Sequence, residues 1–138
     1  MNEQWRIVVA SSDLEARRRL GAALSAEGLE PICASGVAEC RAALQAGDVG
    51  LIFCDSDLKD GSYVDILRLA RRGESKARVV VTSGSPDWDE YLRAIRFGAF
   101  DVMSLPSRPI DLKWIVTQAR RDDRAQNYGP NVQSRMTA

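Results

Sequence analysis

Five short runs rich in β-branched residues alternate with five segments of helical periodicity along this chain of 138 residues. Turn-forming residues bound each run, which is typical of strands. A regular alternation of strands and helices predicts parallel strands joined by helical crossovers. The predicted strands cover residues 5–10, 29–34, 49–54, 78–82 and 100–103, and the predicted helices cover residues 16–24, 37–44, 64–70, 88–95 and 112–119.

The third run, residues 49–54, is apolar throughout instead of alternating between apolar and polar residues. This pattern is typical of a strand in a parallel sheet that helices cover on both faces. We therefore predict an α/β fold: a doubly wound, five-stranded parallel sheet of (βα)5 type in three α/β/α layers, with strand order 2-1-3-4-5. In such a sheet, functional residues gather at the carboxyl ends of the first and third strands, where the strand order reverses.

Composition excludes several classes of function. The chain contains no histidine, which removes the commonest general base and the serine–histidine and cysteine–histidine catalytic pairs. Nineteen basic and nineteen acidic side chains give no net charge, which argues against nucleic acid or an anionic membrane as a partner. The sequence has no apolar run long enough for a membrane span and no signal-peptide pattern at its beginning. We expect a cytoplasmic protein that is not an enzyme.

Polar residues follow the predicted strands at the carboxyl edge of the sheet. Asp55 stands at the end of the third strand, and Asp57 and Asp60 follow it in the same loop. Carboxylates there can hold a hard cation, or one of them can act as a nucleophile. We interpret Asp60 as a cap of the third helix and Asp57 as a solvated side chain, which leaves Asp55 as the functional candidate.

Several linked motifs resemble the receiver domains of two-component response regulators, over residues 5–120. An apolar strand precedes Asp55, and Leu58 and Asp60-Gly61 follow it as in the phosphoacceptor loop of that family. The segment Phe97-Gly98-Ala99-Phe100-Asp101 is similar to the family's turn before the fifth strand, and Pro106 stands where the family has a Lys-Pro pair.

The resemblance implies a flavodoxin-like receiver topology and a switch that accepts a phosphoryl group from a histidine kinase. Asp55 matches the phosphoacceptor, and Ser83 matches the hydroxyl that contacts the phosphoryl group. The backbone carbonyl of Asp57 matches a magnesium ligand.

The chain departs from the family at the residues that carry the chemistry. Ser11 and Ser12 replace the acidic pair that holds magnesium, so that metal affinity should fall steeply. Asp13 is a replacement ligand in principle, although its ordinary role there is to stabilise the start of a helix. Leu105 replaces the lysine, and Val102 replaces the aromatic switch residue. We expect weak magnesium binding or none, and no other cofactor.

Three hypotheses for function follow. We prefer a degenerate receiver, a pseudo-receiver that acts through protein–protein interaction with weak or no magnesium-dependent phosphorylation. The alternative is a competent receiver, a phosphoprotein modified on Asp55 by a histidine kinase, which uses Asp13 as an added metal ligand or a cation supplied by the phosphodonor. The third is a flavodoxin-like binder of a small cofactor, which is disfavoured because residues 11–15 lack a phosphate-binding cradle.

The surface of the fourth helix, fifth strand and fifth helix is the expected interface. The candidates are Trp114, Lys113, Arg93 and Arg96, whereas the register of Trp88 in its helix favours core packing. The expected partner is a sensor histidine kinase or another signalling protein, and the resemblance also implies a homodimer through this surface.

Residues 1–121 are predicted to form one receiver-like domain. Residues 122–138 are mostly polar and are predicted to be a disordered tail. The chain is therefore interpreted as a single-domain receiver without a DNA-binding effector domain.

Overall fold

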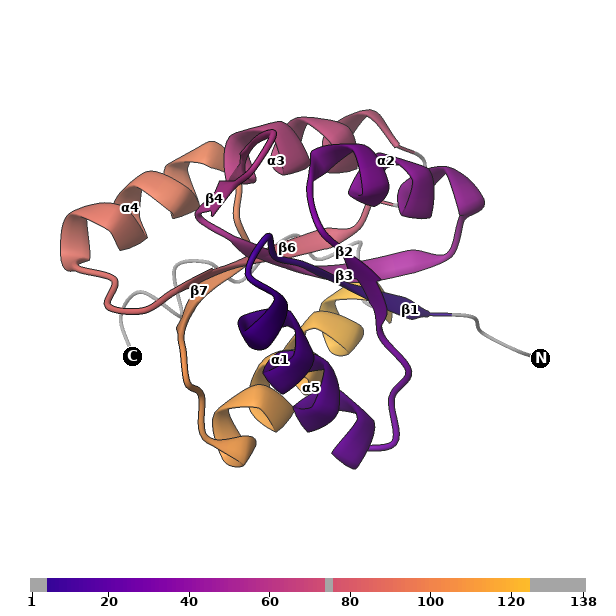
Figure 1. Cartoon of the computed structure of the whole chain (residues 1–138), viewed down its shortest axis with the longest axis vertical. Helices are drawn as coiled ribbons and strands as arrows, with labels where there is room; N and C mark the ends of the chain where they lie inside the picture. The colour runs from indigo at the N-terminus through magenta and orange to yellow at the C-terminus, as the bar shows by residue number, and fades with distance from the viewer. Residues whose placement is uncertain (1–4, 74–75, 125–138) are drawn as a thin grey trace.

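The five predicted strands form one parallel sheet in the computed structural model, which describes residues 5–73 and 76–124, with side chains as far as residue 121. Their order is β2-β1-β3-β6-β7, so the predicted order 2-1-3-4-5 is confirmed (Figure 1). The strands are β1 (Arg6–Ala10), β2 (Ile32–Ala34), β3 (Val49–Asp55), β6 (Arg78–Ser83) and β7 (Asp101–Ser104).

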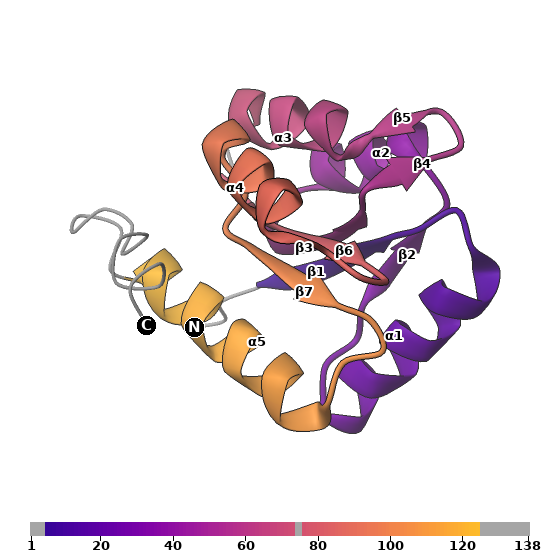
Figure 2. The ribbon, with the colours of Figure 1, turned by 90° about the vertical axis from the view of Figure 1, so that its left-hand side faces the viewer.

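Five helices within the described residues cover the two faces of this sheet. Helices α1 and α5 lie on one face, and α2, α3 and α4 lie on the other (Figure 1, Figure 2). The predicted three-layer α/β/α arrangement is therefore confirmed. The helices are α1 (Leu14–Ala26), α2 (Val37–Ala46), α3 (Tyr63–Arg72), α4 (Trp88–Phe97) and α5 (Pro109–Arg124).

Strand β3 lies between β1 and β6 at the centre of the sheet, and all its residues before Asp55 are buried. Leu51 and Phe53 belong to the hydrophobic cluster that includes residues of α1 and α5. Ile52 and Cys54 belong to the cluster on the opposite face, with residues of α2 and α3. Complete burial of a large apolar side chain contributes roughly 1.5–3 kcal/mol. The uniformly apolar sequence of β3 therefore serves two cores at once.

Trp5 links the beginning of the sheet to helix α5. Its indole lies so close to Gly50 that a Cβ at that position would collide with the ring. The guanidinium carbon of Arg120 lies 4.8 Å from the ring centroid, which is within cation–π range. Glycine is needed inside β3 at this point because the indole occupies the space of a side chain.

A short antiparallel hairpin, which we did not predict, follows β3. It consists of β4 (Asp57–Leu58) and β5 (Gly61–Ser62). A Cβ at Gly61 would meet Val37 Cγ2 at 2.8 Å, so glycine lets the hairpin pack against the start of α2. Ser62 then caps α3 through a capping box with the side chain three residues later.

The interpretation of Trp88 as a core residue is wrong. Its side chain is 62% exposed at the beginning of α4, and it stacks on Tyr91 with the ring centroids 5.4 Å apart. Ala94 is the buried residue of this helix, while Leu92 and Ile95 are half-buried. Helix α4 therefore packs through a narrow strip near Ala94, and its first turn lies outside that strip.

Helix α5 continues to Arg124, past the predicted domain boundary at residue 121. The remainder of the predicted tail, residues 125–138, lies outside the described residues. Of the helices in the described part of the chain, none combines the length and the apolar character needed to cross a membrane.

Candidate functional site

The candidate site lies at the carboxyl edge of the sheet, where β1, β3 and β6 end side by side. Asp55 is the last residue of β3 and lies opposite Thr82 of β6 in the strand register. Ser11 directly follows β1, on the other side of β3. Because side chains alternate between the faces of a pleated sheet, laterally paired residues present their side chains to the same face. The register thus brings hydroxyl groups to both sides of the Asp55 carboxylate.

Both carboxylate oxygens of Asp55 accept a hydrogen bond from a buried hydroxyl. Ser11 Oγ donates to Oδ2 at 2.6 Å, and Thr82 Oγ1 donates to Oδ1 at 2.7 Å. Ser11 and Thr82 are each 2% exposed, whereas Asp55 is half-buried. Such distances are typical of hydrogen bonds to an ionised acceptor, which are roughly twice as strong as neutral ones. Two neutral donors therefore hold the carboxylate in place.

The Ser11 hydroxyl is itself oriented by the chain around it. Its oxygen accepts a hydrogen bond from Asp13 N at 3.2 Å, and the Ser11 carbonyl accepts one from Arg17 Nη1 at 2.7 Å. An acidic residue at this position would face Asp55 with a second negative charge, and like charges in one site oppose ionisation. The serine instead supplies a donor, so the contact with Asp55 is attractive where an acidic residue would make it repulsive.

The hydroxyl that contacts Asp55 from β6 belongs to Thr82, which we did not predict. Ser83, the predicted residue, is half-buried at the end of β6, and its carbonyl accepts a hydrogen bond from Leu105 N at 2.9 Å. The signal for Thr82 lies in the register, because Leu51 pairs with Arg78 and the same offset pairs Asp55 with Thr82. The role of Ser83 concerns a phosphorylated state and stays a prediction.

Ser12 has a different role from its neighbour, since its hydroxyl joins two loops. Its Oγ donates to the Ser35 carbonyl at 2.7 Å and accepts from Lys59 N at 2.8 Å. Lys59 Nζ also donates to Ser35 Oγ at 3.1 Å. The loop after β3 is thus tied to the loops after β1 and β2. The two serines at the predicted acidic-pair positions perform separate tasks, one at the Asp55 carboxylate and one at these loops.

Asp60 caps α2, and the interpretation that it caps the third helix is wrong. Its carboxylate accepts from Val37 N at 2.6 Å and from Ala38 N at 3.2 Å. These backbone hydrogen bonds at the helix N-terminus lower the pKa of Asp60 from its ordinary value. The N-cap residue of α2 is Gly36, which has no capping side chain, and a Cβ there would collide with the Asp60 carboxylate. A residue from a distant loop therefore supplies the cap.

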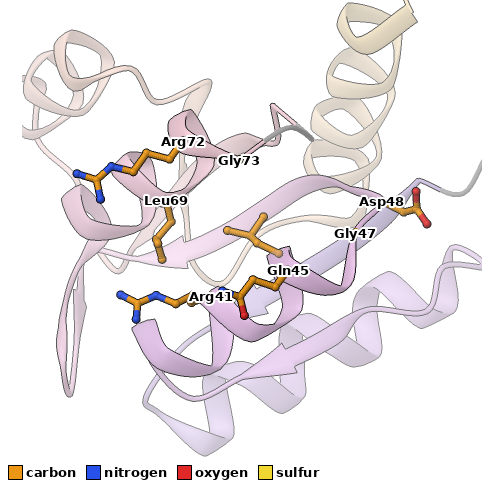
Figure 3. Close-up of a pocket in the computed structure, with 8 residues that line it drawn as sticks. Arg41, Gln45, Gly47, Asp48, Leu69, Arg72 and Gly73 are labelled. Atoms are coloured by element: carbon orange, nitrogen blue, oxygen red, sulfur yellow. The ribbon is translucent and has the colours of Figure 1, made fainter.

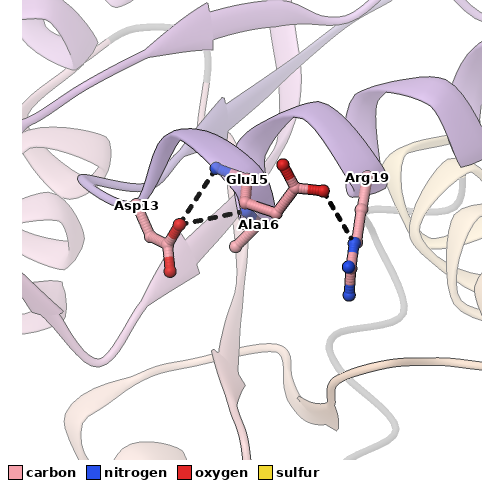
Figure 4. Close-up of polar contacts among 4 residues, drawn as sticks. All are labelled: Asp13, Glu15, Ala16 and Arg19. Carbon is pink, nitrogen blue, oxygen red and sulfur yellow. Dashed lines mark hydrogen bonds and ion pairs between the residues drawn. The ribbon is translucent and has the colours of Figure 1, made fainter.

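Asp13 is the N-cap of α1. Its Oδ1 accepts from Glu15 N at 2.9 Å and from Ala16 N at 3.3 Å (Figure 4). Glu15 in turn forms an ion pair with Arg19, with Oε2 and Nε 3.1 Å apart. The Asp13 carboxylate is therefore engaged by the helix, in the ordinary role expected for it. Its role as a metal ligand stays a prediction.

Magnesium, which the resemblance implies, fits this set of donors poorly. Mg²⁺ takes one or two carboxylates together with water and substrate phosphate. Over residues 5–73 and 76–121, no three Asp, Glu, His or Cys side chains come together as a metal site. Asp13 and Asp60 cap helices, and the side chain of Asp57 is exposed on β4. The backbone carbonyl of Asp57 as a ligand stays a prediction.

Leu105, at the position where the resemblance implies a lysine, makes apolar contacts. Its side chain is partly buried against the hydrophobic cluster of α1 and α5. Together with Pro106 and Leu20 of α1 it lines a cavity of about 250 Å³. A leucine side chain has no donor for a phosphoryl oxygen, so this position cannot supply charge-assisted hydrogen bonding.

Val102 is half-buried in a small cluster with Val81, Ala94 and Ala99. The ring of Tyr63, at the start of α3, packs against the same cluster and meets Phe97 edge-on at a centroid distance of 6.3 Å. Burial raises the pKa of Tyr63 from its ordinary value. The aromatic ring in this region therefore comes from α3 instead of from β7.

The predicted interface residues all lie on the surface. Trp114 is 62% exposed on α5, with Lys113 exposed beside it. Arg93 and Arg96 are exposed on α4. Their exposure is compatible with an interface, and their participation in one stays a prediction.

Comparison with curated proteins finds regulatory proteins at modest identity, while no model of a known protein family matches the chain. The photosynthetic apparatus regulatory protein RegA of Rhodovulum sulfidophilum is 27% identical over 112 residues, which is 81% of this chain and 61% of RegA. The acid tolerance regulatory protein ActR of Rhizobium meliloti is 26% identical over 106 residues, 77% of this chain and 55% of ActR. The chain thus spans little more than half the length of these relatives.

Solved structures of receiver domains share the fold. A CheY-like receiver domain protein from Methanospirillum hungatei superposes with a TM-score of 0.76 at 18% identity, over 88% of this chain and 97% of that one. The beryllofluoride-activated NtrC4 receiver domain gives 0.77 at 21% identity, over 86% and 98%. The receiver domain of NtrX from Brucella abortus gives 0.74 at 25% identity, over 82% and 96%. The chain therefore has the flavodoxin-like receiver fold.

Proposed function

We propose that this chain is a degenerate receiver of two-component signal transduction, which acts through protein–protein interaction with weak or no magnesium-dependent phosphorylation. The receiver fold and the regulatory relatives support a signalling role in preference to a catalytic one. The observation that carries the proposal is the state of Asp55, whose two carboxylate oxygens accept hydrogen bonds from Ser11 and Thr82.

Phosphoryl transfer depends on positioning and on neutralisation of the charge that develops on the phosphoryl oxygens. At this site the donors to the carboxylate are two hydroxyls, and residue 105, where the resemblance implies a lysine, is a leucine. To form a phosphoaspartate, one Asp55 oxygen must donate an electron pair to phosphorus while the bond between phosphorus and the leaving group of the phosphodonor breaks. That oxygen must also lose the hydrogen bond that it accepts from Ser11 or Thr82. Each of these features raises the barrier to forming a phosphoaspartate on Asp55.

The same features suit a module whose resting conformation needs no ligand. The hydroxyl donors satisfy both oxygens of Asp55 without a cation, and Ser12 ties the neighbouring loops together through Ser35 and Lys59. The surface that binds partners then keeps one conformation, with or without a ligand at Asp55. Such a module signals by binding a histidine kinase or another signalling protein, with its occupancy set by partner concentration and affinity.

Phosphorylation is tested with purified protein, magnesium and acetyl phosphate, followed by intact-mass spectrometry. We expect no mass increase corresponding to a phosphoryl group. NMR spectra with beryllofluoride should leave the amides of Asp55 and Ser83 unshifted. Asp55→Asn is the control for both measurements.

A phosphoryl adduct that disappears in Asp55→Asn would overturn the proposal in favour of a competent receiver. The position of Asp55 supports that alternative. Asp55 lies at the carboxyl end of β3 and is only half-buried, so a phosphodonor can reach it from solvent. A ligand-derived visible absorbance in the purified protein would instead favour a flavodoxin-like cofactor binder.

We further propose that partners or a second copy bind through α4, β7 and α5, with Trp114 as the anchor. Tryptophan is enriched among residues that dominate interface energetics, and this one is 62% exposed. The NtrC4 receiver domain with a similar fold is described as a dimer. Analytical ultracentrifugation of Trp114→Ala should show weaker self-association than the parent chain. Unchanged self-association and unchanged partner binding would exclude Trp114 as the anchor.

A further inference from the structure

A pocket lies at the edge of the sheet opposite Asp55, between the carboxyl ends of α2 and α3. Both helices end there just before the strands that follow them, β3 and β6. The pocket has a volume of about 630 Å³, which is within the range of ligand-binding clefts. It is lined by Arg41, Leu44, Gln45, Gly47, Asp48, Leu69, Arg72 and Gly73 (Figure 3).

Two arginines dominate the charge of this pocket. The side chains of Arg41 and Arg72 are exposed and extend to the same side, with Leu69 between them, whereas Asp48 points away (Figure 3). In the described part of the chain neither arginine has an ion-pair partner. By contrast the adjacent Arg71 donates to the Phe97 carbonyl at 2.9 Å. Arg41 and Arg72 therefore offer two unengaged guanidinium groups on one rim.

The floor of the pocket is aliphatic. Leu44 and Leu69 are half-buried and pack against the core cluster of α2 and α3. Both leucines also line the pocket. An aliphatic side chain placed there would remove apolar area from water on both sides.

The backbone carbonyls at the carboxyl ends of α2 and α3 restrict the kind of ligand that the pocket can bind. Gly47 N donates to the Leu44 carbonyl and Gly73 N to the Leu69 carbonyl, each at 3.1 Å. The other carbonyls in the last turn of a helix lack helical donors and carry partial negative charge. These carbonyls disfavour any anion in direct contact with the helix ends, but they accept hydrogen bonds from backbone N–H groups. A peptide supplies such N–H groups together with carboxylates.

We propose that this pocket binds an acidic peptide segment of a partner protein, with an aliphatic side chain on Leu44 and Leu69 and carboxylates on Arg41 and Arg72. Guanidinium groups bind carboxylates with two parallel hydrogen bonds, which gives direction as well as attraction. The proposal does not depend on the state of Asp55, because the pocket lies at the other edge of the sheet.

Fluorescence anisotropy at low ionic strength tests the pocket with a dye-labelled peptide in which glutamates flank a central leucine. Arg41→Glu and Arg72→Glu should each weaken binding by about fivefold or more, because each replaces an attraction with a repulsion. Arg18→Glu on α1, across the sheet, is the matched control and should change binding less than about twofold. Circular dichroism confirms that each variant is folded.

Three further measurements define the ligand. A peptide with lysines in place of glutamates should not bind, and one with serine in place of leucine should bind more weakly. In NMR titrations the amides of Gly47 and Gly73 should shift on adding the glutamate peptide. Equal weakening by Arg18→Glu, shifts confined to other regions, or displacement of the peptide by low-millimolar inorganic phosphate would each overturn the proposal.

Discussion

The two edges of the sheet differ in how they use their charged groups. At the carboxyl edge the carboxylates of Asp13, Asp55 and Asp60 accept hydrogen bonds from helix amides or hydroxyls of the same chain. At the opposite edge Arg41 and Arg72 line a pocket, and neither has an ion-pair partner within the described residues. Internally paired groups stabilise the fold, whereas unpaired surface charges are available to a partner. Substitutions at the first edge should therefore affect stability, and substitutions at the second should affect binding.

The largest loss of stability is expected from Ser11→Asp, which removes a hydrogen-bonded pair at the carboxyl edge. It replaces a donor to Asp55 with a buried like charge, and an uncompensated buried charge costs about 3–5 kcal/mol. Urea unfolding at neutral pH measures the loss. Millimolar magnesium should recover part of it, because a cation between two carboxylates binds the folded state.

Ser12→Asp is the matched control, one residue later and exposed. It removes the hydroxyl bonds to the loops but places no charge beside Asp55, so its loss of stability should be smaller. Equal losses at the two positions would contradict the separate roles assigned to the two serines.

Thr82→Val tests the second hydroxyl. Valine has the same shape but leaves Asp55 Oδ1 without this donor, and we expect a loss of about 1–3 kcal/mol in the free energy of unfolding. Thr82→Ser retains the hydroxyl and should lose less. Ser83→Ala should change stability by less than about 0.5 kcal/mol. A greater loss from Ser83→Ala than from Thr82→Val would contradict the assignment of Thr82 as the β6 hydroxyl that holds Asp55.

Asp60→Asn tests whether the charge of a carboxylate at the carboxyl edge stabilises the fold, because its effect on stability should depend on pH. The folded-state pKa of Asp60 lies below its ordinary value of 3.8, so its ionised carboxylate stabilises the folded state above that pH. This contribution is lost as pH falls through the folded-state pKa. Thermal unfolding should therefore show Asp60→Asn less stable than the parent chain at pH 7, with the difference vanishing in strong acid. A difference that is constant with pH would exclude the charged cap.

The smallest effect on stability is expected from Arg41→Glu and Arg72→Glu. Exposed substitutions away from structural contacts change stability by less than about 0.5 kcal/mol. Arg71→Glu loses the hydrogen bond to the Phe97 carbonyl and should lower the unfolding midpoint further. If the Arg41 or Arg72 variant lost as much stability as the Arg71 variant, these arginines would belong to the folded structure instead of to a binding surface.

The fold was predictable because its signals are local or repeat along the chain. The apolar run that forms β3 identifies a doubly covered strand without knowledge of its neighbours. Alternation with helical periodicity then determines parallel topology, and Asp55 falls at the carboxyl edge as a direct consequence.

The site contacts were less predictable because they depend on register and on distant residues. Thr82 and Ser83 are adjacent hydroxyl residues, and only the pairing of β6 with β3 decides which reaches Asp55. Asp60 caps a helix that begins 23 residues earlier, which no local capping pattern contains. Trp88 lies in register with apolar residues of α4, yet the contact strip of the helix does not extend to its first turn.

Because Asp60 caps α2, the backbone amide of Val37 responds to movement of the distant loop that carries Asp60. Val37 N is bonded to Asp60 at 2.6 Å, and Gly36 has no side chain that could replace this acceptor. When the loop after β3 moves away, the amides of Val37 and Ala38 lose the carboxylate that accepts their hydrogen bonds. The hydrogen-exchange rate at Val37 thus measures how often the loop beside Asp55 opens, from a position on a different helix.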